Sequence, residues 1–176
     1  MTIRIRQITA DTMSQDVETT ARLAQVIWTE HYTSLIGAPM VAYMLENIQS
    51  ATRISRDISE NGYRYWLAED AATGEAIGYC AAFQESNLLF LSKIYVLDTY
   101  RGRGVGRALL SPLKSWCDQT SLGRIQLLVS KGNAASIAAY KKMGFKLVGT
   151  RTTPIGGGFT MNDYVMDLMV GDVTGR

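Results

Sequence analysis

The segment Arg101–Leu110, which reads Arg-Gly-Arg-Gly-Val-Gly-Arg-Ala-Leu-Leu, constrains the fold of this chain more than any other stretch. An apolar, β-rich run at 88–97 leads into it, and a helical pattern follows it. Its three glycines allow the backbone to turn tightly and to bring its amides close to a ligand. The first amides of the following helix have no partner inside that helix and lie at the positive end of its dipole. The sequence therefore predicts a strand–loop–helix unit whose loop binds an anion such as a phosphate or pyrophosphate.

Two widespread phosphate loops do not match this segment. A dinucleotide fingerprint needs a glycine where Arg107 stands, and an acidic residue about 20 positions later, where the chain has Arg-Ile-Gln at 124–126. A Walker A loop needs a terminal Gly-Lys-Ser/Thr, which is absent. The residues fit the pattern Arg-x-x-Gly-x-Gly-x-Ala instead. Taken alone, the loop is also explained by a glycine-rich turn that caps a helix, with its arginines in solvent.

A second pattern lies in the strand and helix that come next. The apolar run Ile125–Val129 has the length of a strand rather than a helix. After it, Asn133 is a good helix N-cap, and Gly144 stands where a helix commonly ends on glycine. Together these residues read Asn-x-x-Ser-x-x-x-Tyr-x-x-x-Gly-Phe, which predicts a short capped helix with Tyr140 on the same side as Asn133.

These two patterns, in this order and at this spacing, resemble the signatures of the GCN5-related N-acetyltransferase (GNAT) family. The resemblance covers Leu88–Asp167 closely and the N-terminal half in outline. It implies an α/β fold with a mixed sheet, and acetyl-CoA as co-substrate. It also implies direct transfer of the acetyl group to an amine, and the chain shows no nucleophile-plus-base motif that would favour an acyl-enzyme.

Periodicity and turn residues predict one domain over 1–170, which the resemblance implies is GNAT-like, with a tail at 171–176. The predicted order is β-α-α-β-β-β-α-β-α-β-β. The predicted strands are 3–8, 63–69, 76–84, 88–97, 124–130, 145–153 and 159–169. The predicted helices are 14–35, 39–49, the stretch from the glycine loop to about 119, and 133–143, with one more helical stretch at 50–60. Pro112 lies inside the third of these helices and should kink it.

The resemblance also assigns cofactor-binding residues. The pantetheine arm of the cofactor would lie between two splayed strands, 88–97 and 124–130, and the loop amides would hold the pyrophosphate. One of the lysines at the end of the predicted helix 133–143 would contact the 3′-phosphate. The implied residues are Ile94, Tyr95, Val96, Arg101, Gly102, Arg103, Gly104, Val105, Gly106, Arg107, Ala108, Asn133, Ser136 and Lys142.

Tyr140 is the predicted catalytic residue. A phenol at this position can hydrogen-bond the departing sulfur and protonate it. Spacing alone favours Tyr140 as a core aromatic on an alanine-rich helix, and the family pattern is what reverses that preference toward catalysis.

The acceptor side is less determined by the sequence. By resemblance, the helices after the first strand and the last hairpin would form its walls, which points to Trp28, His31, Tyr32, Tyr43, Met161, Asn162 and Asp163. A cationic amine would find carboxylates at Glu30 and Asp163. His31 is a candidate base, but the sequence supplies it with no orienting partner. The run 159–167 and the Trp28-x-x-x-Tyr32 spacing resemble a bacterial subgroup with polyamine-acetylating members.

Composition limits the other possibilities. A net charge of +2 over 176 residues is too small to predict nucleic acid as the main partner. One histidine and two scattered cysteines match no zinc spacing, so no metal site is predicted. No signal peptide or transmembrane run is evident, and we expect a cytoplasmic protein whose partners are acetyl-CoA and a small amine. A homodimer, a non-catalytic acyl-CoA-binding module and a protein or peptide N-acetyltransferase remain open alternatives.

Overall fold

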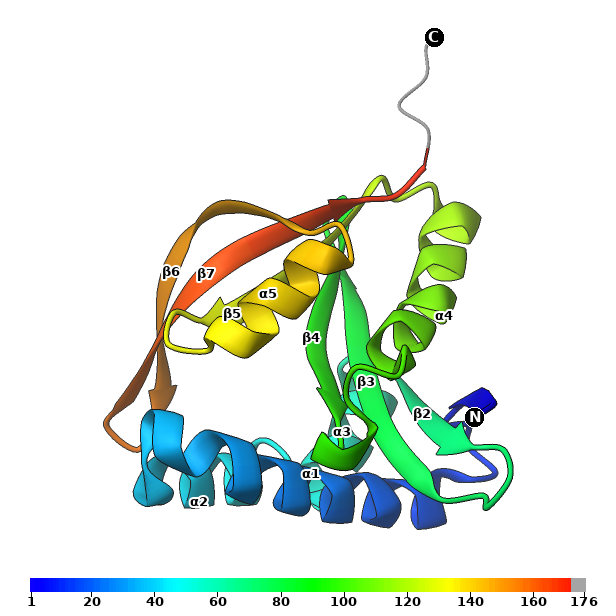
Figure 1. Cartoon of the computed structure of the whole chain (residues 1–176), viewed down its shortest axis with the longest axis horizontal. Helices are drawn as coiled ribbons and strands as arrows, with labels where there is room; N and C mark the ends of the chain where they lie inside the picture. Colours follow the sequence, from blue (N-terminus) through cyan, green and yellow to red (C-terminus); the bar gives the residue numbers. More distant parts are fainter. Residues whose placement is uncertain (172–176) are drawn as a thin grey trace, which may run out of the picture. The chain divides into compact units, whose positions relative to one another are not determined.

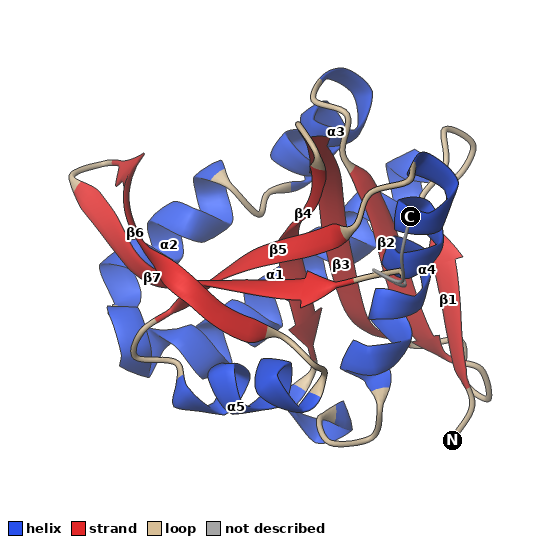
Figure 2. Ribbon diagram, turned by 90° about the horizontal axis from the view of Figure 1, so that it is seen from above, coloured by secondary structure: helices blue, strands red, loops and turns tan. Residues whose placement is uncertain are grey.

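A computed structural model describes residues 1–171, so the predicted tail lies outside the described residues apart from Gly171. Seven strands form one mixed sheet in the order β1-β2-β3-β4-β5-β7-β6, as the α/β prediction required (Figures 1 and 2). The strands are β1 (Ile3–Gln7), β2 (Arg64–Asp70), β3 (Ala76–Glu85), β4 (Leu88–Val96), β5 (Arg124–Ser130), β6 (Lys146–Gly156) and β7 (Phe159–Met169). The helices are α1 (Met13–Ile36), α2 (Ala38–Asn47), α3 (Ala51–Glu60), α4 (Val105–Thr120) and α5 (Ala134–Lys142), with a short 3-10 helix, η1, at Asp98–Tyr100.

The chain forms two compact units. The first unit contains residues 1–82 and 93–110, and the second contains residues 83–92 and 111–176, of which the structure describes those up to 171. β3, β4 and α4 each begin in one unit and end in the other.

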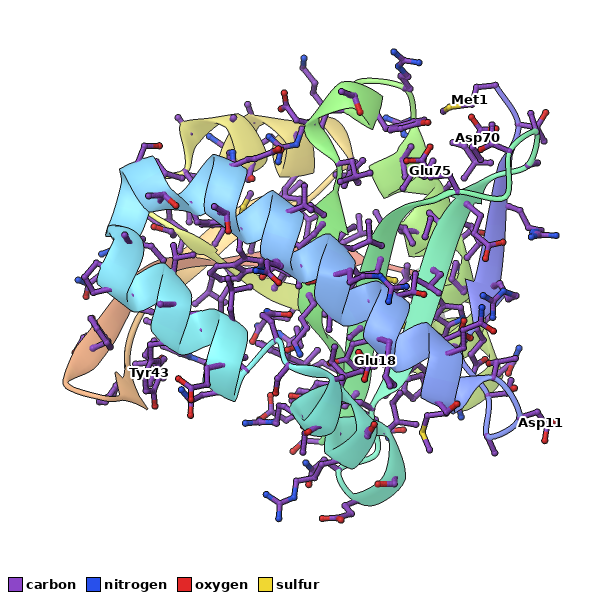
Figure 3. All side chains as sticks on the ribbon, turned by 90° about the horizontal axis from the view of Figure 1, so that it is seen from below. Met1, Asp11, Glu18, Tyr43, Asp70 and Glu75 are labelled. Atoms are coloured by element: carbon purple, nitrogen blue, oxygen red, sulfur yellow. The ribbon has the colours of Figure 1, made fainter. Side chains whose placement is uncertain are left out.

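In the first unit, three helices follow the first strand. The β1, β2 and β3 strands pair antiparallel, and α1 packs against both α2 and α3 (Figure 1). Gly37, with φ 86°, separates α1 from α2, and a proline in the first turn of α2 suits a helix start. The Ser50 hydroxyl accepts a hydrogen bond from the Arg53 amide at 3.3 Å and thereby caps α3. Tyr43 on α2 and Glu75 at the β2–β3 turn mark opposite ends of this unit (Figure 3).

In the second unit, β5 pairs with β7 along its whole length, and β6 lies at the outer edge of the sheet (Figure 2). β4 runs parallel to β5, but their ladder contains only the pairs from Leu89 with Ile125 to Leu91 with Leu127. α5 ends before Gly144, which has φ 101°. A Cβ at Gly144 would come within 3.2 Å of the Leu168 side chain, so glycine fits here for its conformation and for its size.

The observed elements differ from the predicted ones in a few places. The predicted order counts two helices between the first two strands, whereas the stretch at 50–60 forms a separate third helix, α3. β6 continues to Gly156, beyond its predicted end at 153, because its hairpin partner β7 supplies pairing up to Phe159. Pro112 does lie inside α4, as predicted. Among residues 1–171, no helix is both long and apolar enough to cross a membrane.

Candidate active site

The glycine loop joins β4 to α4 in the first unit. Gly102 and Gly104 have φ values of 73° and 86°, in the left-handed region that favours glycine. A Cβ at either position would meet nothing within 4 Å, so the space beside the loop is open. α4 begins at Val105, and its first turn is anchored by the buried side chains of Val105 and Leu109. The amides at the start of α4 lack partners within the helix, and this geometry fits a pyrophosphate group.

Arg101 does not present its side chain to this open space. Its Nε donates to the Val96 carbonyl at 3.2 Å, and its Nη1 lies 3.1 Å from Asp98 Oδ1 and 3.2 Å from His31 Nδ1. The guanidinium therefore joins the end of β4 to α1. Arg103 and Arg107 are exposed, and the Arg103 guanidinium lies 5.5 Å from the ring centre of Tyr100.

The contact with Arg101 also defines the state of His31. An arginine can only donate, so His31 Nδ1 must accept, and the neutral imidazole carries its proton on Nε2. In that tautomer neither ring nitrogen has a lone pair free to take a proton from an amine. No orienting partner for His31 is evident from the sequence alone. The structure supplies one, and it disfavours His31 as the base.

An aromatic cluster surrounds Tyr95 on β4. The Trp28 and Tyr32 rings of α1 are stacked with centroids 4.3 Å apart, and the Tyr95 ring lies 5.5 Å from Trp28 and 6.1 Å from Tyr32. Tyr79 of β3 completes the cluster, 5.3 Å from Tyr95. The structure thus brings two predicted acceptor-side residues together with a predicted cofactor-strand residue. Both Trp28 and Tyr32 are buried in the core of this unit.

Beyond the ladder with β5, the backbone groups of β4 point alternately toward β3 and away from it. The Leu97 amide donates to Ile77 of β3 at 2.9 Å, and a Cβ at Gly78 would come within 2.8 Å of the Tyr95 carbonyl. Because backbone groups of neighbouring strand residues point to opposite edges, Tyr95 faces β3, whereas Ile94 and Val96 face away from it. Ile94 and the amide of Val96 are therefore better placed than Tyr95 to offer backbone groups to a ligand, since the Val96 carbonyl already accepts from Arg101.

The α5 helix of the second unit carries Tyr140 and Asn133. Asn133 is buried, and its Oδ1 accepts a hydrogen bond from the Ser136 amide at 3.3 Å, as predicted for an N-cap. Tyr140 is partly exposed, and its ring makes an edge contact with Phe145 at 5.9 Å. Lys142 is exposed at the end of this helix. Tyr140 thus has packing on one side and accessible surface, which both of the predicted explanations allow.

Asp163 on β7 is the most unusual polar group of the second unit. It is 4% exposed, and its Oδ1 has no hydrogen-bond partner among the described residues. Its neighbours across the sheet are Ser130 on β5 and Arg151 on β6. Burial raises the pKa of this carboxyl group above its usual value, while the charges of Arg151 and Lys131 oppose that rise. A buried carboxylate with an unsatisfied oxygen is suited to receive a donor from a ligand.

The other predicted acceptor-side residues have ordinary surroundings. Glu30 is exposed, and Tyr43 and Met161 are half-buried. Asn162 is exposed, and its Oδ1 lies 3.0 Å from Thr152 Oγ1. Within residues 1–171, no group of three histidine, cysteine, aspartate or glutamate side chains could hold a metal ion.

Sequence reasoning missed one polar cluster. Lys93 is buried in the first unit with Tyr65 and Asp57. The only signal in the sequence was a lysine standing alone in the apolar run 88–97.

The fold and the loop define a protein of the class that binds a coenzyme through a strand–glycine loop–helix unit. The Acetyltransferase (GNAT) family matches residues 22–145, which is well over half of the chain. The chain therefore belongs to the GNAT family, as the sequence signatures predicted.

Relatives with curated descriptions match in part of their length. An uncharacterised N-acetyltransferase of Mycobacterium bovis is 34% identical over 94 residues, which are 53% of this chain and 60% of that protein. The L-methionine sulfoximine/L-methionine sulfone acetyltransferase of Pseudomonas aeruginosa is 32% identical over 96 residues, which are 52% of this chain and 55% of that protein. The chain thus covers between half and two thirds of the length of these relatives.

Solved structures match over almost the whole chain. The PaiA N-acetyltransferase from Thermoplasma acidophilum, in complex with coenzyme A, has a TM-score of 0.78 at 21% identity and covers 96% of this chain and 99% of its own. A phosphinothricin acetyltransferase from Sinorhizobium meliloti, in complex with acetyl-CoA, has a TM-score of 0.61 at 26% identity. The match covers 97% of this chain and 90% of that chain. The first likeness concerns the fold alone. Together with the family match, the second likeness agrees with the predicted class of acyl-CoA-dependent N-acyltransferases.

Proposed function

We propose that this protein is an N-acetyltransferase that moves the acetyl group of acetyl-CoA directly to the amine of a small cationic molecule such as a polyamine. The amine nitrogen forms a bond to the thioester carbonyl carbon, the carbon–sulfur bond breaks, and the amine gives up a proton. Two features support the cofactor half of this proposal, namely the family match and the open glycine loop at the start of α4.

In this proposal the chain's own groups have separate tasks. The loop backbone around Gly102 and Gly104 and the first amides of α4 hold the pyrophosphate. The outward backbone groups of Ile94 and Val96 bind the pantetheine arm, and an amide of this strand polarises the acetyl carbonyl. Tyr140 gives a proton to the departing thiolate.

The main support for a cationic acceptor is the buried Oδ1 of Asp163, which has no hydrogen-bond partner among the described residues. Its buried, unpartnered oxygen would accept a hydrogen bond from an ammonium group, and the charge of its carboxylate would favour that ligand. A free alkyl amine with a pKa near 10.4 is neutral in only about one molecule in two thousand at pH 7. A carboxylate that holds the ammonium form can also take its proton before attack.

The test is release of coenzyme A thiol from acetyl-CoA in the presence of an amine panel. The panel contains spermidine, an aminoglycoside, methionine sulfone as an amino-acid amine, and a peptide with a free N-terminus. We expect turnover with spermidine to exceed turnover with the peptide by at least tenfold in kcat/KM. Preference for the peptide would support the protein or peptide N-acetyltransferase instead. Acetyl-CoA binding without turnover of any amine would support the non-catalytic binding module.

A further inference from the structure

Lys93 is a buried cation in the strand that leads to the glycine loop. Its side chain is 3% exposed, and it stands in β4 directly before Ile94. An ammonium group that is removed from water must find partners for its three N–H groups. The proposed transfer reaction gives Lys93 no role, so its burial calls for a separate explanation.

Three elements of the first unit supply the partners of Lys93. Its Nζ donates to the Tyr65 phenol oxygen on β2 at 2.5 Å and to the Ile48 carbonyl at 3.0 Å. Asp57 Oδ2 on α3 lies 3.7 Å away. Ile48 is the C-cap residue of α2, where helix carbonyls are unpaired and attract cations. Lys93 thus connects β4 to β2 and to the ends of two helices.

Asp57 is itself fixed from the other side. Its Oδ1 accepts hydrogen bonds from Arg53 Nε at 2.8 Å and from Asn61 Nδ2 at 3.0 Å. These bonds leave Oδ2 directed toward Lys93 and hold the carboxylate in one orientation. The cluster is therefore a rigid acceptor for the lysine rather than a flexible ion pair.

Stability alone is a poor reason for such a cluster. Replacing a buried ion pair by apolar residues of similar volume is often neutral or stabilising. The position of Lys93 offers a better reason. The ladder between β4 and β5 ends at Leu91, two residues earlier, so the next part of β4 has lost its partner on that edge. Lys93 is the first residue after that point with strong side-chain bonds.

We propose that Lys93 is a positioning residue that fixes β4 after its ladder with β5 ends, so that Ile94 and Val96 present their outward backbone groups to the pantetheine arm. This inference rests on the proposed function for the role of Ile94 and Val96. Because Lys93 acts through the backbone of the residues that follow it, its removal should loosen a cofactor-binding segment without removing any cofactor contact.

The experiment compares Lys93→Met with Asp16→Asn. Asp16 is a matched control, because it is also buried in the first unit and also forms an ion pair, in its case with Arg6 Nη1 at 2.6 Å. The affinity for acetyl-CoA is measured by calorimetry, and amide hydrogen exchange is measured at 94–97. For Lys93→Met we expect a rise of at least tenfold in the Kd and faster exchange at 94–97. Asp16→Asn should leave both readouts within twofold at a similar loss of thermal stability.

Folded Lys93→Met with an acetyl-CoA Kd within twofold of the parent protein would overturn the inference. Tyr65→Phe removes one acceptor and keeps the ring, and it provides the same test at a smaller effect, about threefold, should Lys93→Met fail to fold. The exchange measurement separates this inference from the proposed function, because it needs no ligand. If the parent protein does not bind acetyl-CoA, the proposed function fails. Unchanged exchange at 94–97 in Lys93→Met would contradict the positioning role by itself.

Discussion

The two units treat buried carboxylates differently. In the first unit, Asp16, Asp57 and Glu69 are buried and each is paired with at least one arginine. In the second unit, Asp167 accepts a hydrogen bond from Gln126 Nε2 at 2.8 Å, but Asp163 keeps one oxygen without a partner among the described residues. The contrast appears in the pKa values as well. The hydrogen bonds from Arg6 hold the pKa of Asp16 below its usual value, whereas burial raises the pKa of Asp163.

This difference distinguishes carboxylates whose hydrogen bonds hold the fold from one whose oxygen the fold leaves without a donor. In a paired carboxylate, hydrogen bonds from the arginine replace the water contacts that were lost on burial. Removing the arginine therefore destabilises the protein. An unpaired carboxylate lacks these hydrogen bonds, so a ligand that donates to it gains more than it would at a paired one. Under the proposed function, the first unit supplies a fixed frame around β4 and the glycine loop, and Asp163 of the second unit offers its unpartnered oxygen to the acceptor.

The largest effect is expected at the loop of the first unit. Gly104→Glu should raise the Kd for acetyl-CoA at least a hundredfold, because the new carboxylate would occupy the place of the anion and repel it. Gly104→Ala is the matched control, since it has the same strain at φ 86° but no charge, and nothing lies within 4 Å of its Cβ. Equal affinities of the two folded variants would refute the phosphate loop.

On the second unit, Tyr140→Phe should lower kcat by roughly 10- to 1000-fold, the usual range for a general acid, with little change in acetyl-CoA affinity. Phenylalanine keeps the edge contact with Phe145. Steady-state kinetics with the preferred amine from the panel is the measurement. A rate within twofold of the parent enzyme would show that Tyr140 serves only in packing.

The buried ammonium group of Lys93 in the first unit predicts that stability depends on pH. Burial lowers the pKa of Lys93 to about 8, below the value of about 10.4 in an unfolded chain. Between these values the unfolded chain binds the extra proton, so the Lys93 contribution to the unfolding free energy rises with pH, by about 3 kcal/mol in total. Chemical denaturation at pH 7 and 9.5 should show this rise in the parent protein. Lys93→Met should lack it, and an equal slope in both proteins would contradict the prediction.

Asp163 and Asp167 on β7 allow the comparison to be tested within one strand. Asp163→Asn should lower kcat/KM for a cationic amine by roughly 10- to 100-fold, the loss expected for a hydrogen bond to a charged group. It should not lower stability at pH 7, because a raised folded pKa means that stability is lost as pH rises through it. Asp167→Asn breaks the pair with Arg124 and should lower stability while kcat/KM stays unchanged. The reverse pattern would assign the two carboxylates the opposite roles.

The smallest effect is expected at His31. Activity should rise from pH 6 to 9 as more of the amine becomes neutral. Because His31 Nδ1 already accepts from Arg101, His31→Ala should leave the shape of this profile unchanged. Loss of the rising limb near pH 6.5 in the folded variant would instead identify His31 as the base.

Much of the fold followed from local patterns. The strand–loop–helix unit around Gly104 and the capped α5 helix were predicted within a few residues, and so was the α/β class. The third helix, α3, was the main omission from the predicted order, although its residues were recognised as helical. The polyamine subgroup remains a prediction, as do the roles of the site residues.

The features that could be predicted from the sequence depend on residues that are neighbours along the chain. Gly102 and Gly104 at positive φ, the unpaired amides of α4 and the Asn133 cap arise within a few residues of each other. Which side chains already have hydrogen-bond partners could be seen only in the folded structure. Arg101 meets His31 across 70 positions, Lys93 meets Ile48 across 45, and no donor reaches Asp163 Oδ1 from any part of the described chain. Burial and pairing of charge depend on residues that folding brings together, and no local pattern encodes them.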